Sequence, residues 1–489
     1  MAGIVGMFGA HPDKPATQKM LKRIHHRGPD STELHQDVRC SFGVCASDLS
    51  KARGNGMARK NEIVVLLDGE LYNDRNPGQS DAEVVTDLYK EYGRTFPAHL
   101  NGVFACAVFD GQNLLLARDS VGVRPLYWAE TDTGDICFAS ELKALVGIGH
   151  DVQELGPSTT FVTGAGIAGY LPIFPEVELN ASFEEAVKKV RETVLEAVRR
   201  RLEDKAVGAC LLSGGLDSSI IAAAANHLGA SDLPLVTIGM EGAPDVENAR
   251  VMADSLDMEH RVYIFDSDEI VSLVPRAVRT LESFDEDCIS GTISNLIASS
   301  IASEYTNCTL SGEGGDELFG GYHLLKQLDT QQKRLKMMDK LIDVAYNTAL
   351  QRLDRAMMGN SINYRTPFID TDVIALAMQL PVRWKISLKS DTGKEIEKYI
   401  LREAFKDLLP ERIYTRDKLR FAAGTGTDDL MDQVARKSIE HTDFNEKTRK
   451  TPEGYYLNSP KELWYYRLFK QEFPDPAFER LAGRWNPDK

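Results

Sequence analysis

The sequence predicts an α/β protein built from two parts of different texture. Up to about residue 175, short strands alternate with Gly-rich turns, and from residue 182 onward short apolar strands alternate with helices. The first pattern is typical of antiparallel sheets, and the second of a parallel sheet covered by helices on both faces. A chain of 489 residues is long enough for two or three domains. We therefore expect two domains, residues 1–175 and 182–489.

The N-terminal part carries strand, turn and helix signals at short intervals. Residues 63–67 form an apolar strand, after which we expect a turn at 68–70, Asp-Gly-Glu. Two further apolar runs, 103–109 and 114–117, flank an Asp-Gly pair and predict a β-hairpin. The clearest helix covers 82–92.

A capping box opens the C-terminal part. Ser182 is followed three residues later by Glu185, and the helix that they begin is expected to run to about Leu202. Beyond it, apolar strands and helical segments alternate, and after Leu310 the pattern is mostly helical. The expected strands are 207–212, 235–239, 262–265 and 308–310, and the expected helices are 218–227 and 246–256.

Composition narrows the class of protein. The net charge of −16 argues against nonspecific binding to nucleic acid. The seven cysteines are scattered and form no CxxC pair, so we expect neither a disulfide framework nor a zinc site, and a reducing cytoplasm as the natural location. No run approaches the roughly 18 apolar residues of a membrane span, and the N-terminus lacks the basic segment of a signal peptide.

The strongest motif is the heptad at 213–219, Ser-Gly-Gly-Leu-Asp-Ser-Ser, which follows an apolar strand and opens a helix. Glycines let the backbone approach an anion closely, and a helix N-terminus offers N–H groups and positive dipole. Ser213, Ser218 and Ser219 add hydroxyl donors. Asp217 would repel a bare phosphate, so we expect it to hold magnesium. The alternative is a turn that only reverses the chain, but the whole heptad in this context favours a phosphate loop.

A second Gly-rich segment, 311–322, follows another short strand and reads Ser-Gly-Glu-Gly-Gly-Asp-Glu-Leu-Phe-Gly-Gly-Tyr. Glu313, Asp316 and Glu317 would repel one another unless a cation lay among them, and magnesium with ATP would supply that cation. An acidic surface turn is the alternative. The glycines and aromatic residues favour a tight site over a solvated face.

These motifs carry a resemblance to known families. The heptad resembles the pyrophosphate loop of the N-type ATP pyrophosphatases, and the segment 311–322 resembles the signature of the asparagine synthetase and β-lactam synthetase family. Similar segments follow in the family's order along nearly the whole chain. They are Arg27-Gly28-Pro29-Asp30, 117–119 with Gly122, 125–127, 138–143, Arg365 with 367–370, 401–403 and 416–418.

The resemblance implies a fold for each part. Residues 1–175 would form an αββα sandwich of the N-terminal-nucleophile hydrolase type, a glutaminase domain. Residues 182–489 would form a parallel-sheet α/β domain with many helices, of the adenine-nucleotide α-hydrolase type. A homodimer is a further expectation at the level of the family.

The resemblance also implies an ATP-dependent ligase that adenylates a carboxylate, releases pyrophosphate and passes the acyl group to ammonia or an amine. Glu313 would act in adenylation and in deprotonating the amine, and Lys418 would stabilise the negative charge that develops. A surface lysine is the alternative for Lys418. The remaining assignments are adenosine on Leu211, Ile238, Ser311 and Gly312, pyrophosphate on Ser213, Gly214, Gly215, Asp217 and Ser218, and magnesium on Asp217 and Asp316.

The N-terminal part departs from the family where glutaminase chemistry is needed. Ala2 stands in place of the nucleophilic cysteine, and a methyl group is no nucleophile. The arginine that holds glutamine is missing from 42–49. The oxyanion segment Asn-Gly-Glu reads Asp68-Gly69-Glu70, which puts an acid where negative charge would develop. Only Asp81 matches the expected reader of the glutamine amine.

We therefore expect glutamine hydrolysis to be lost, with ammonia or an amine as the nitrogen donor. An engineered Cys-to-Ala change would explain Ala2 alone but not the other two departures. Cys40 or Cys45 as a replacement nucleophile would lack the terminal amine that the chemistry uses.

The residues expected around the acyl substrate differ as well. Glu282 and Asp285 are kept, but the family's Thr-Thr-Ile-Arg run, whose arginine can hold an aspartate α-carboxylate, reads Asp287-Cys288-Ile289-Ser290. Asp287 could attract a cationic amine or merely cap the helix that begins nearby. Arg420 could supply the lost positive charge.

Three functions stay open. A carboxylate–amine ligase is favoured, acting on aspartate or on another carboxylate, with ring closure as in β-lactam synthetases among the possibilities. A second function is another adenylating chemistry, such as nucleotide amination or sulfur transfer. The third is a catalytically silent scaffold or regulator, against which the intact ATP-site residues argue.

Overall fold

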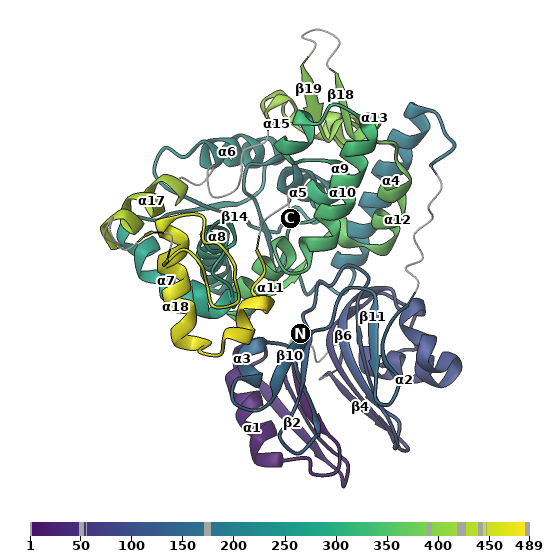
Figure 1. Ribbon diagram of the computed structural model, residues 1–489. Helices are drawn as coiled ribbons and strands as arrows, with labels where there is room; N and C mark the ends of the chain where they lie inside the picture. Colours follow the sequence, from purple (N-terminus) through teal and green to yellow (C-terminus); the bar gives the residue numbers. More distant parts are fainter. Residues whose placement is uncertain are drawn as a thin grey trace.

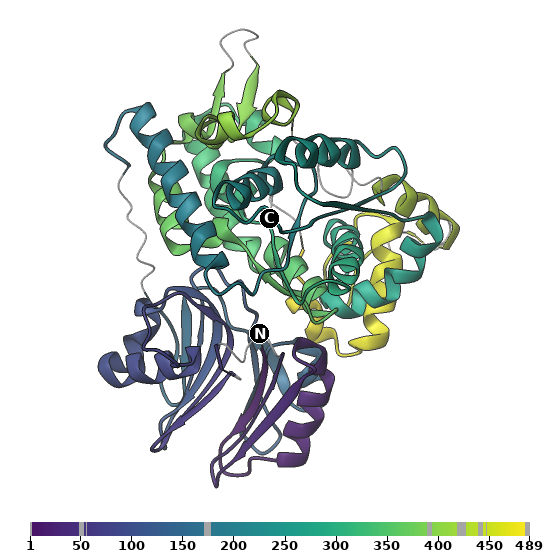
Figure 2. The same ribbon diagram turned by 180° about the vertical axis from the view of Figure 1, so that it is seen from behind.

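A computed structural model describes residues 2–47, 53–54, 56–170, 178–388, 394–417, 427–438, 444–445 and 447–484. Two facing sheets form the lower part of the molecule and a larger helical part lies above them (Figure 1), an arrangement that the view from behind repeats (Figure 2). The sheets are antiparallel below and parallel above, so the predicted α/β fold class is confirmed.

The lower part is a sandwich of two six-stranded sheets. The first has the order β10-β8-β9-β1-β3-β2 and the second the order β12-β11-β7-β6-β5-β4, with antiparallel pairing throughout. The strands are β1 (Ala2–Phe8), β2 (Ser31–Gln36), β3 (Cys40–Ala46), β4 (Met57–Lys60), β5 (Ile63–Leu71), β6 (Gly102–Phe109), β7 (Leu114–Arg118), β8 (Tyr127–Glu130), β9 (Ile136–Ala139), β10 (His150–Glu154), β11 (Thr159–Val162) and β12 (Gly166–Gly169).

Helices cover the outer face of each sheet and complete four layers. The helix α1 (Lys14–Arg23), with the short α3 (Leu142–Leu145), packs on the first sheet, and α2 (Asp81–Tyr92) packs on the second. Between the sheets, the Phe42 ring meets Phe109 and Phe138 edge-on, with centroids 6.2 and 5.6 Å apart. This αββα sandwich is the fold that the family resemblance implied.

The predicted hairpin and the helix at 82–92 are confirmed, but the turn at 68–70 is wrong. Asp68, Gly69 and Glu70 continue β5 and pair with β6. Gly69 has φ of +151°, and a Cβ there would lie 2.1 Å from the Val103 carbonyl oxygen. The glycine therefore permits close approach of the neighbouring strand instead of reversing the chain.

The upper part is organised by a five-stranded parallel sheet in the order β15-β14-β13-β16-β17. Its strands are β13 (Ala209–Leu211), β14 (Leu235–Gly239), β15 (His260–Ile264), β16 (Cys308–Leu310) and β17 (Asn363–Arg365). Leu235 packs with the core that holds α4 (Phe183–Leu202) and α5 (Leu216–His227). Ile238 packs with the core that holds α7 (Ser267–Leu281) and α8 (Glu286–Ser303). Helices thus cover both faces.

The alternating strands and helices predicted for this part are all present, with ends shifted by a few residues. The capping box is confirmed, because Ser182 accepts from the Glu185 N–H and Glu185 accepts from the Ser182 N–H. The further elements are α6 (Pro244–Leu256), α9 (Gly315–Phe319), α10 (Gln331–Ala345), α11 (Ala349–Met358), α12 (Thr371–Gln379), α13 (Val382–Lys385), β18 (Ile386–Leu388), β19 (Glu395–Glu397), α14 (Tyr399–Phe405), α15 (Glu411–Thr415), α17 (Thr427–Ser438) and α18 (Pro460–Glu472).

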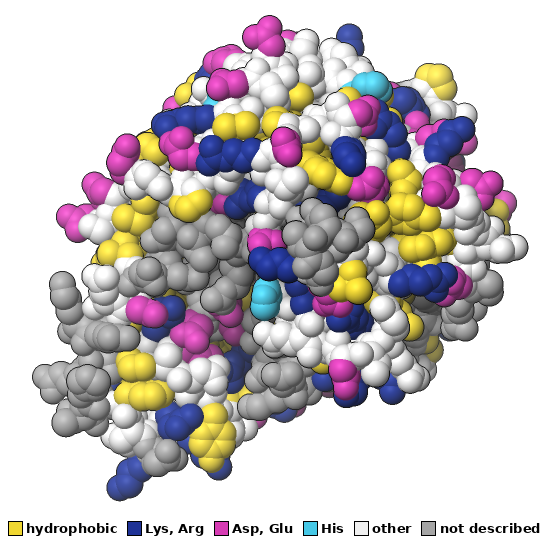
Figure 3. All heavy atoms as spheres, turned by 90° about the horizontal axis from the view of Figure 1, so that it is seen from above, with side chains coloured by type: hydrophobic (Ala, Val, Ile, Leu, Met, Phe, Trp, Pro, Cys, Tyr) yellow, Lys and Arg dark blue, Asp and Glu magenta, His cyan; other side chains and the backbone are white. Residues whose placement is uncertain are grey.

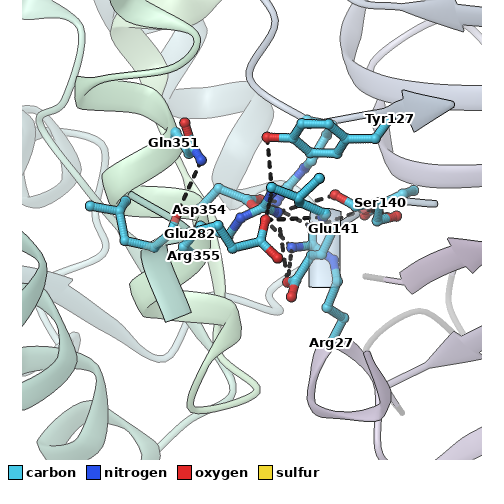
Figure 4. A network of polar contacts seen from close by, with 12 residues as sticks. Arg27, Tyr127, Ser140, Glu141, Glu282, Gln351, Asp354 and Arg355 are labelled. Atoms are coloured by element: carbon cyan, nitrogen blue, oxygen red, sulfur yellow. Dashed lines mark hydrogen bonds and ion pairs between the residues drawn. The ribbon is translucent and has the colours of Figure 1, made fainter. Parts of the chain in front are cut away.

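A buried ionic network joins the two parts (Figure 4). The Arg27 guanidinium lies 2.9 Å from Asp68 and Glu141 and 2.7 Å from Asp354 on α11, and all four side chains are inaccessible to water. Removing one partner from such a cluster leaves a buried charge uncompensated, so the network fixes how the parts sit together.

Two surface properties complete the description. Basic and acidic side chains are interspersed over the face seen from above (Figure 3). Among the helices that the structure describes, none is both long and apolar enough to cross a membrane.

Candidate active site

A cavity of about 370 Å³ opens at the carboxyl ends of β13, β14 and β16. In a parallel α/β sheet this edge is where ligands bind, because loops and helix N-termini converge there. Most of the residues predicted for the ATP site line it. They are Leu211, Ser213, Gly215, Asp217, Ser218, Ile238, Ser311, Gly312, Glu313 and Asp316.

The loop between β13 and α5 has a geometry that could receive an anion. Gly214 has φ of +69°, and a Cβ there would lie 2.3 Å from the Asp245 carbonyl oxygen, so only glycine fits. The Ser213 N–H donates to the Ser218 hydroxyl at 3.1 Å, which closes the loop. Gly215 is the N-cap of α5 and brings no side chain to the first helical N–H groups, which leaves them for a phosphate.

Arg416 holds this loop from outside. Its guanidinium donates to the Gly214 carbonyl oxygen and lies 2.8 Å from the Asp245 carboxylate. An arginine about 200 positions further along the chain therefore holds the conformation of this loop.

The two predicted magnesium ligands, Asp217 and Asp316, both contact the same lysine side chain. The Lys398 ammonium contacts Asp217 and lies 2.5 Å from Asp316 Oδ1, with its side chain 1% exposed. Gly321 makes room for this contact, since a Cβ there would lie 2.0 Å from Asp316 Oδ1 and 2.2 Å from Lys398 Cε. The pair of carboxylates is thus arranged around positive charge.

This donor set fits magnesium that arrives with a nucleotide. Mg²⁺ is commonly held by one or two protein carboxylates together with substrate phosphates. Over the described part of the chain, no group of three or more His, Cys, Asp and Glu side chains could hold a metal by itself. Asp217 and Asp316 would therefore need phosphate oxygens to complete a magnesium site.

Glu313 lines the cavity and is held by Arg352 of α11, with Arg352 Nη2 3.0 Å from Glu313 Oε1. Gly291, in the interior of α8, gives this arginine its space, because a Cβ there would lie 2.5 Å from Arg352 Cδ. Glycine costs about 1 kcal/mol inside a helix relative to alanine, so the space is maintained at the expense of helix stability.

Tyr322 and Glu317 form a second polar pair beside the cavity. The Tyr322 hydroxyl donates to Glu317, and Tyr322 lines the cavity wall. Burial, with Asp316 and then Glu313 nearby, raises the pKa of Glu317 to about 7. The three acids of the motif do meet in one place, as the sequence predicts.

The residues predicted around the acyl substrate are dispersed. Asp287 lines the cavity, but it is not the cap of α8, because Asp285 takes the N-cap position and accepts from the Cys288 N–H at 2.9 Å. Glu282 is not among the residues lining the cavity; it accepts from the Leu142 and Lys143 N–H groups of the N-terminal part. Lys418 and Arg420 lie outside the described residues.

A second, very small cavity marks the predicted glutaminase site. It measures about 10 Å³ and is lined by Ala2, Arg53, Gly69, Glu70 and Asp81, among others. That volume holds at most about one water molecule.

An arginine from outside the segment 42–49, Arg53, lines this cavity. Arg53 donates to the Leu71 carbonyl oxygen at 2.7 Å and pairs with Asp204 at 3.0 Å, so its guanidinium is already engaged. The predicted position of Asp68 is wrong, because its carboxylate turns away to Arg27 and to the Ser140 hydroxyl.

The two candidate replacement nucleophiles are unsuited to the role. Cys40 and Cys45 are both buried, and burial raises the pKa of each thiol to about 12. The thiolate is the nucleophile, so neither residue is activated near neutral pH.

Comparison with known proteins agrees with both halves of this description. The sequence profile described as Asparagine synthase matches residues 189–353 and 327–477, and the Glutamine amidotransferase domain profile matches residues 1–160. Asparagine synthetase [glutamine-hydrolyzing] 3 of Arabidopsis thaliana is 30% identical over 98% of this chain and 88% of its own length. The chain belongs to the asparagine synthetase family.

A second relative supports the same family. Asparagine synthetase [glutamine-hydrolyzing] of Zea mays is 29% identical over 100% of this chain and 89% of its own length. A solved glutamine phosphoribosylpyrophosphate amidotransferase from B. subtilis covers 53% of this chain and 65% of its own at 14% identity, with a TM-score of 0.30, a similarity too low to carry an argument. Membership of the asparagine synthetase family makes this chain a ligase-type enzyme.

Sequence reasoning missed several residues of this family member's sites. Arg352 contacts Glu313, and Lys398 contacts Asp217 and Asp316. Neither Arg352 nor Lys398 belongs to a Gly-rich or acidic motif. A buried acid needs a cation nearby, so the acidic motif could have prompted a search for one, but its position along the chain would have stayed open. Arg53 carried no signal, because its segment matches no expected pattern.

Proposed function

We propose that this protein is an ATP-dependent, AMP-forming amide ligase that draws its nitrogen from ammonia or an amine and not from glutamine. The observation that carries the proposal is the cavity of about 370 Å³ at the carboxyl ends of β13, β14 and β16. The phosphate loop, the acids Asp217 and Asp316, and the acid–base pair Glu313–Arg352 all face it. A phosphate cradle directly beside a positioned carboxylate suits acyl activation followed by proton removal.

Different parts of the cavity would bind different parts of MgATP. The loop at 213–218 and the N-terminus of α5 would hold the pyrophosphate end of ATP, while Leu211 and Ile238 would flank adenosine. Magnesium bound with the nucleotide would neutralise phosphate charge at Asp217 and Asp316. In this arrangement the α-phosphate would point toward Glu313, beside which the acyl group would bind.

The proposed reaction has two bond exchanges. A carboxylate oxygen attacks the α-phosphorus, the bond to the bridging oxygen breaks and pyrophosphate leaves. The nitrogen of ammonia or an amine then attacks the acyl carbon, the acyl–oxygen bond to AMP breaks, and a proton from nitrogen passes to the Glu313 carboxylate. Arg352 would keep that carboxylate oriented.

The very small cavity beside Ala2 supports a nitrogen donor other than glutamine. Ala2 offers no nucleophile, the cavity beside it holds at most about one water molecule, and Arg53 is engaged by Asp204. Ammonia or a free amine would reach the acyl-adenylate directly.

For the identity of the acyl substrate, one observation favours a carboxylate other than aspartate. Asp287 and Cys288 line the cavity in the segment that replaces the family's Thr-Thr-Ile-Arg run, so this wall adds an acid where a guanidinium would read an α-carboxylate. A specialised amide synthetase, including a ring-closing one of the β-lactam synthetase kind, is therefore the second candidate.

The test is pyrophosphate release from MgATP with ammonium across a panel of carboxylates that begins with aspartate, with and without glutamine. Release with aspartate, asparagine as product and no gain from glutamine would support an ammonia-dependent asparagine synthetase. Release only with another carboxylate would support the second candidate. Glutamine that works as well as ammonium would contradict the loss of hydrolysis, and an absence of release with every carboxylate would contradict the ligase.

A further inference from the structure

Glu70, the acid of the segment that matches the family's glutaminase motif, makes side-chain contacts with the C-terminal domain. Glu70 lies in the small relic cavity, but its carboxylate meets Arg365, the last residue of β17, with contacts of 2.8 Å to Nε and 3.0 Å to Nη2. The Asn363 side-chain amide donates to the same carboxylate at 2.7 Å. The side chains of Glu70 and Arg365 are only 5% and 1% exposed.

Arg365 in turn reaches the ATP site through its backbone. Its carbonyl oxygen accepts the Ser311 N–H at 2.9 Å, in register with the parallel pairing of β16 and β17. Ser311 and the following Gly312 line the large cavity where adenosine is expected. The carboxylate of Glu70 is therefore two contacts away from the floor of that cavity.

The same cluster ties down the end of α4. Asp204, which follows α4, lies 2.7 Å from Arg365 Nη2 and 3.0 Å from Arg53 Nε. Arg53 also lies 4.0 Å from Glu70. Burial raises the pKa of Glu70, but Arg365 and then Arg53 outweigh it and hold the pKa well below its usual range, so the carboxylate is charged at neutral pH.

We infer that Glu70 is a positioning residue for the ATP site, acting across the domain boundary by holding Arg365 and with it Ser311. The inference rests on the proposed function, since it assigns the N-terminal part a role in nucleotide binding. Glu70, which lies in the segment that matches the family's oxyanion segment, here contacts Arg365 at the end of β17. The relic domain is thereby part of the ATP-binding apparatus.

The test is direct binding of MgATP to the full-length protein, which needs neither acyl substrate nor turnover. Glu70→Gln keeps the size of the side chain and removes the charge that Arg365 faces. Mutations along such a contact chain change coupled binding by about 3- to 30-fold, and we expect the Kd for MgATP to rise within that range. In steady state, the KM for ATP should rise while kcat changes by less than about 2-fold, since Glu70 touches no reacting atom.

Asp81→Asn is the matched control. Asp81 lies in the same relic cavity and is equally buried, but its contacts are to the Leu71 N–H, Arg75 and Arg53, all in the N-terminal part. A comparable fall in thermal midpoint for both variants, with weaker MgATP binding only in Glu70→Gln, is the expected result. Equal Kd values in the two variants would overturn the inference.

Two further outcomes stay distinguishable. If Glu70→Gln does not fold, Asn363→Ser removes only the amide contact to Glu70, and a Kd for MgATP unchanged from the wild type would then count against the inference. Wild-type protein that does not bind MgATP would contradict the proposed function itself, whatever the variants do.

Discussion

Arg352 on α11 donates to Glu313 at the end of the acidic loop, with Nη2 3.0 Å from Oε1. The two residues are 39 positions apart in the chain and meet only because α11 packs against α8 beside the sheet edge. Both line the large cavity, so the carboxylate proposed to accept a proton is oriented by a guanidinium inside the site.

Removing either member of this pair should lower kcat much more than it changes the Kd for MgATP. Loss of general-base catalysis costs roughly 10²- to 10⁴-fold, so Glu313→Gln should lower kcat in that range with little change in the Kd for MgATP. Arg352→Gln misplaces the acid and should lower kcat by about 10- to 100-fold. Arg276→Gln, at an exposed arginine bonded to Gly359 and Asn360, serves as the control. Normal kcat in Glu313→Gln would remove this residue from the mechanism.

Lys398 should stabilise the fold when no nucleotide is bound, because its ammonium offsets the charges of Asp217 and Asp316. Without its ammonium, Asp217 and Asp316 repel each other in a buried site, and breaking such contacts costs about 3–5 kcal/mol. Lys398→Met should therefore lower the free energy of unfolding of the nucleotide-free protein. Lys406→Met, at an exposed lysine beside Glu403, should leave it unchanged. Urea unfolding of the wild type and both variants without nucleotide checks this.

Restoring the missing nucleophile should not restore glutaminase activity. The cavity beside residue 2 is about 10 Å³, and Arg53 and Glu70 around it are bound to Asp204 and Arg365. Ala2→Cys should release no glutamate from glutamine above the wild-type background, as measured by a coupled glutamate assay. Glutamate release by the variant would mean that the cavity opens in solution.

Asp354 should stabilise the junction of the two parts at neutral pH. Burial raises its pKa, but Arg27 and then Arg124 overcome this and lower it to about 2. A carboxyl whose pKa is lower in the folded state adds stability above its ordinary pKa of 3.8, which is lost as pH falls toward 2. Asp354→Asn should cost about 3–5 kcal/mol at pH 7, against little for Asp343→Asn at an exposed acid of α10. Equal urea midpoints for the two variants would contradict this role.

Lys385 should destabilise the protein near neutral pH. Burial lowers the pKa of this lysine to about 7 from 10.5, with Asp339 opposing the shift. The unfolded chain then binds more protons than the folded one between pH 7 and about 10, so stability rises with pH across that window. Lys385→Met should be more stable than wild type at pH 7, on the order of 3 kcal/mol, with the gap narrowing by pH 10. A gap that is constant with pH would show that the lysine is already solvated.

The structure explains which predictions from sequence were sound. The strand at 235–239, the capping box at Ser182 and the strand-to-helix turn at 213–219 depend on residues within a few positions of one another. Local periodicity, capping chemistry and glycine conformation decide such features. The turn expected at 68–70 was wrong because Gly69 serves a contact with another strand, which local pattern does not reveal.

The sequence by itself determined the two-part α/β architecture, the phosphate loop, the acidic motif and the loss of a nucleophile at Ala2. Tertiary structure alone decided which cations those acids meet. Lys398 lies 181 positions from Asp217, and Arg365 lies 295 positions from Glu70. Such contacts arise from how helices and strands pack around the sheet edge, and because a buried charge must find a partner wherever packing supplies one, the partner's place in the chain leaves no local trace.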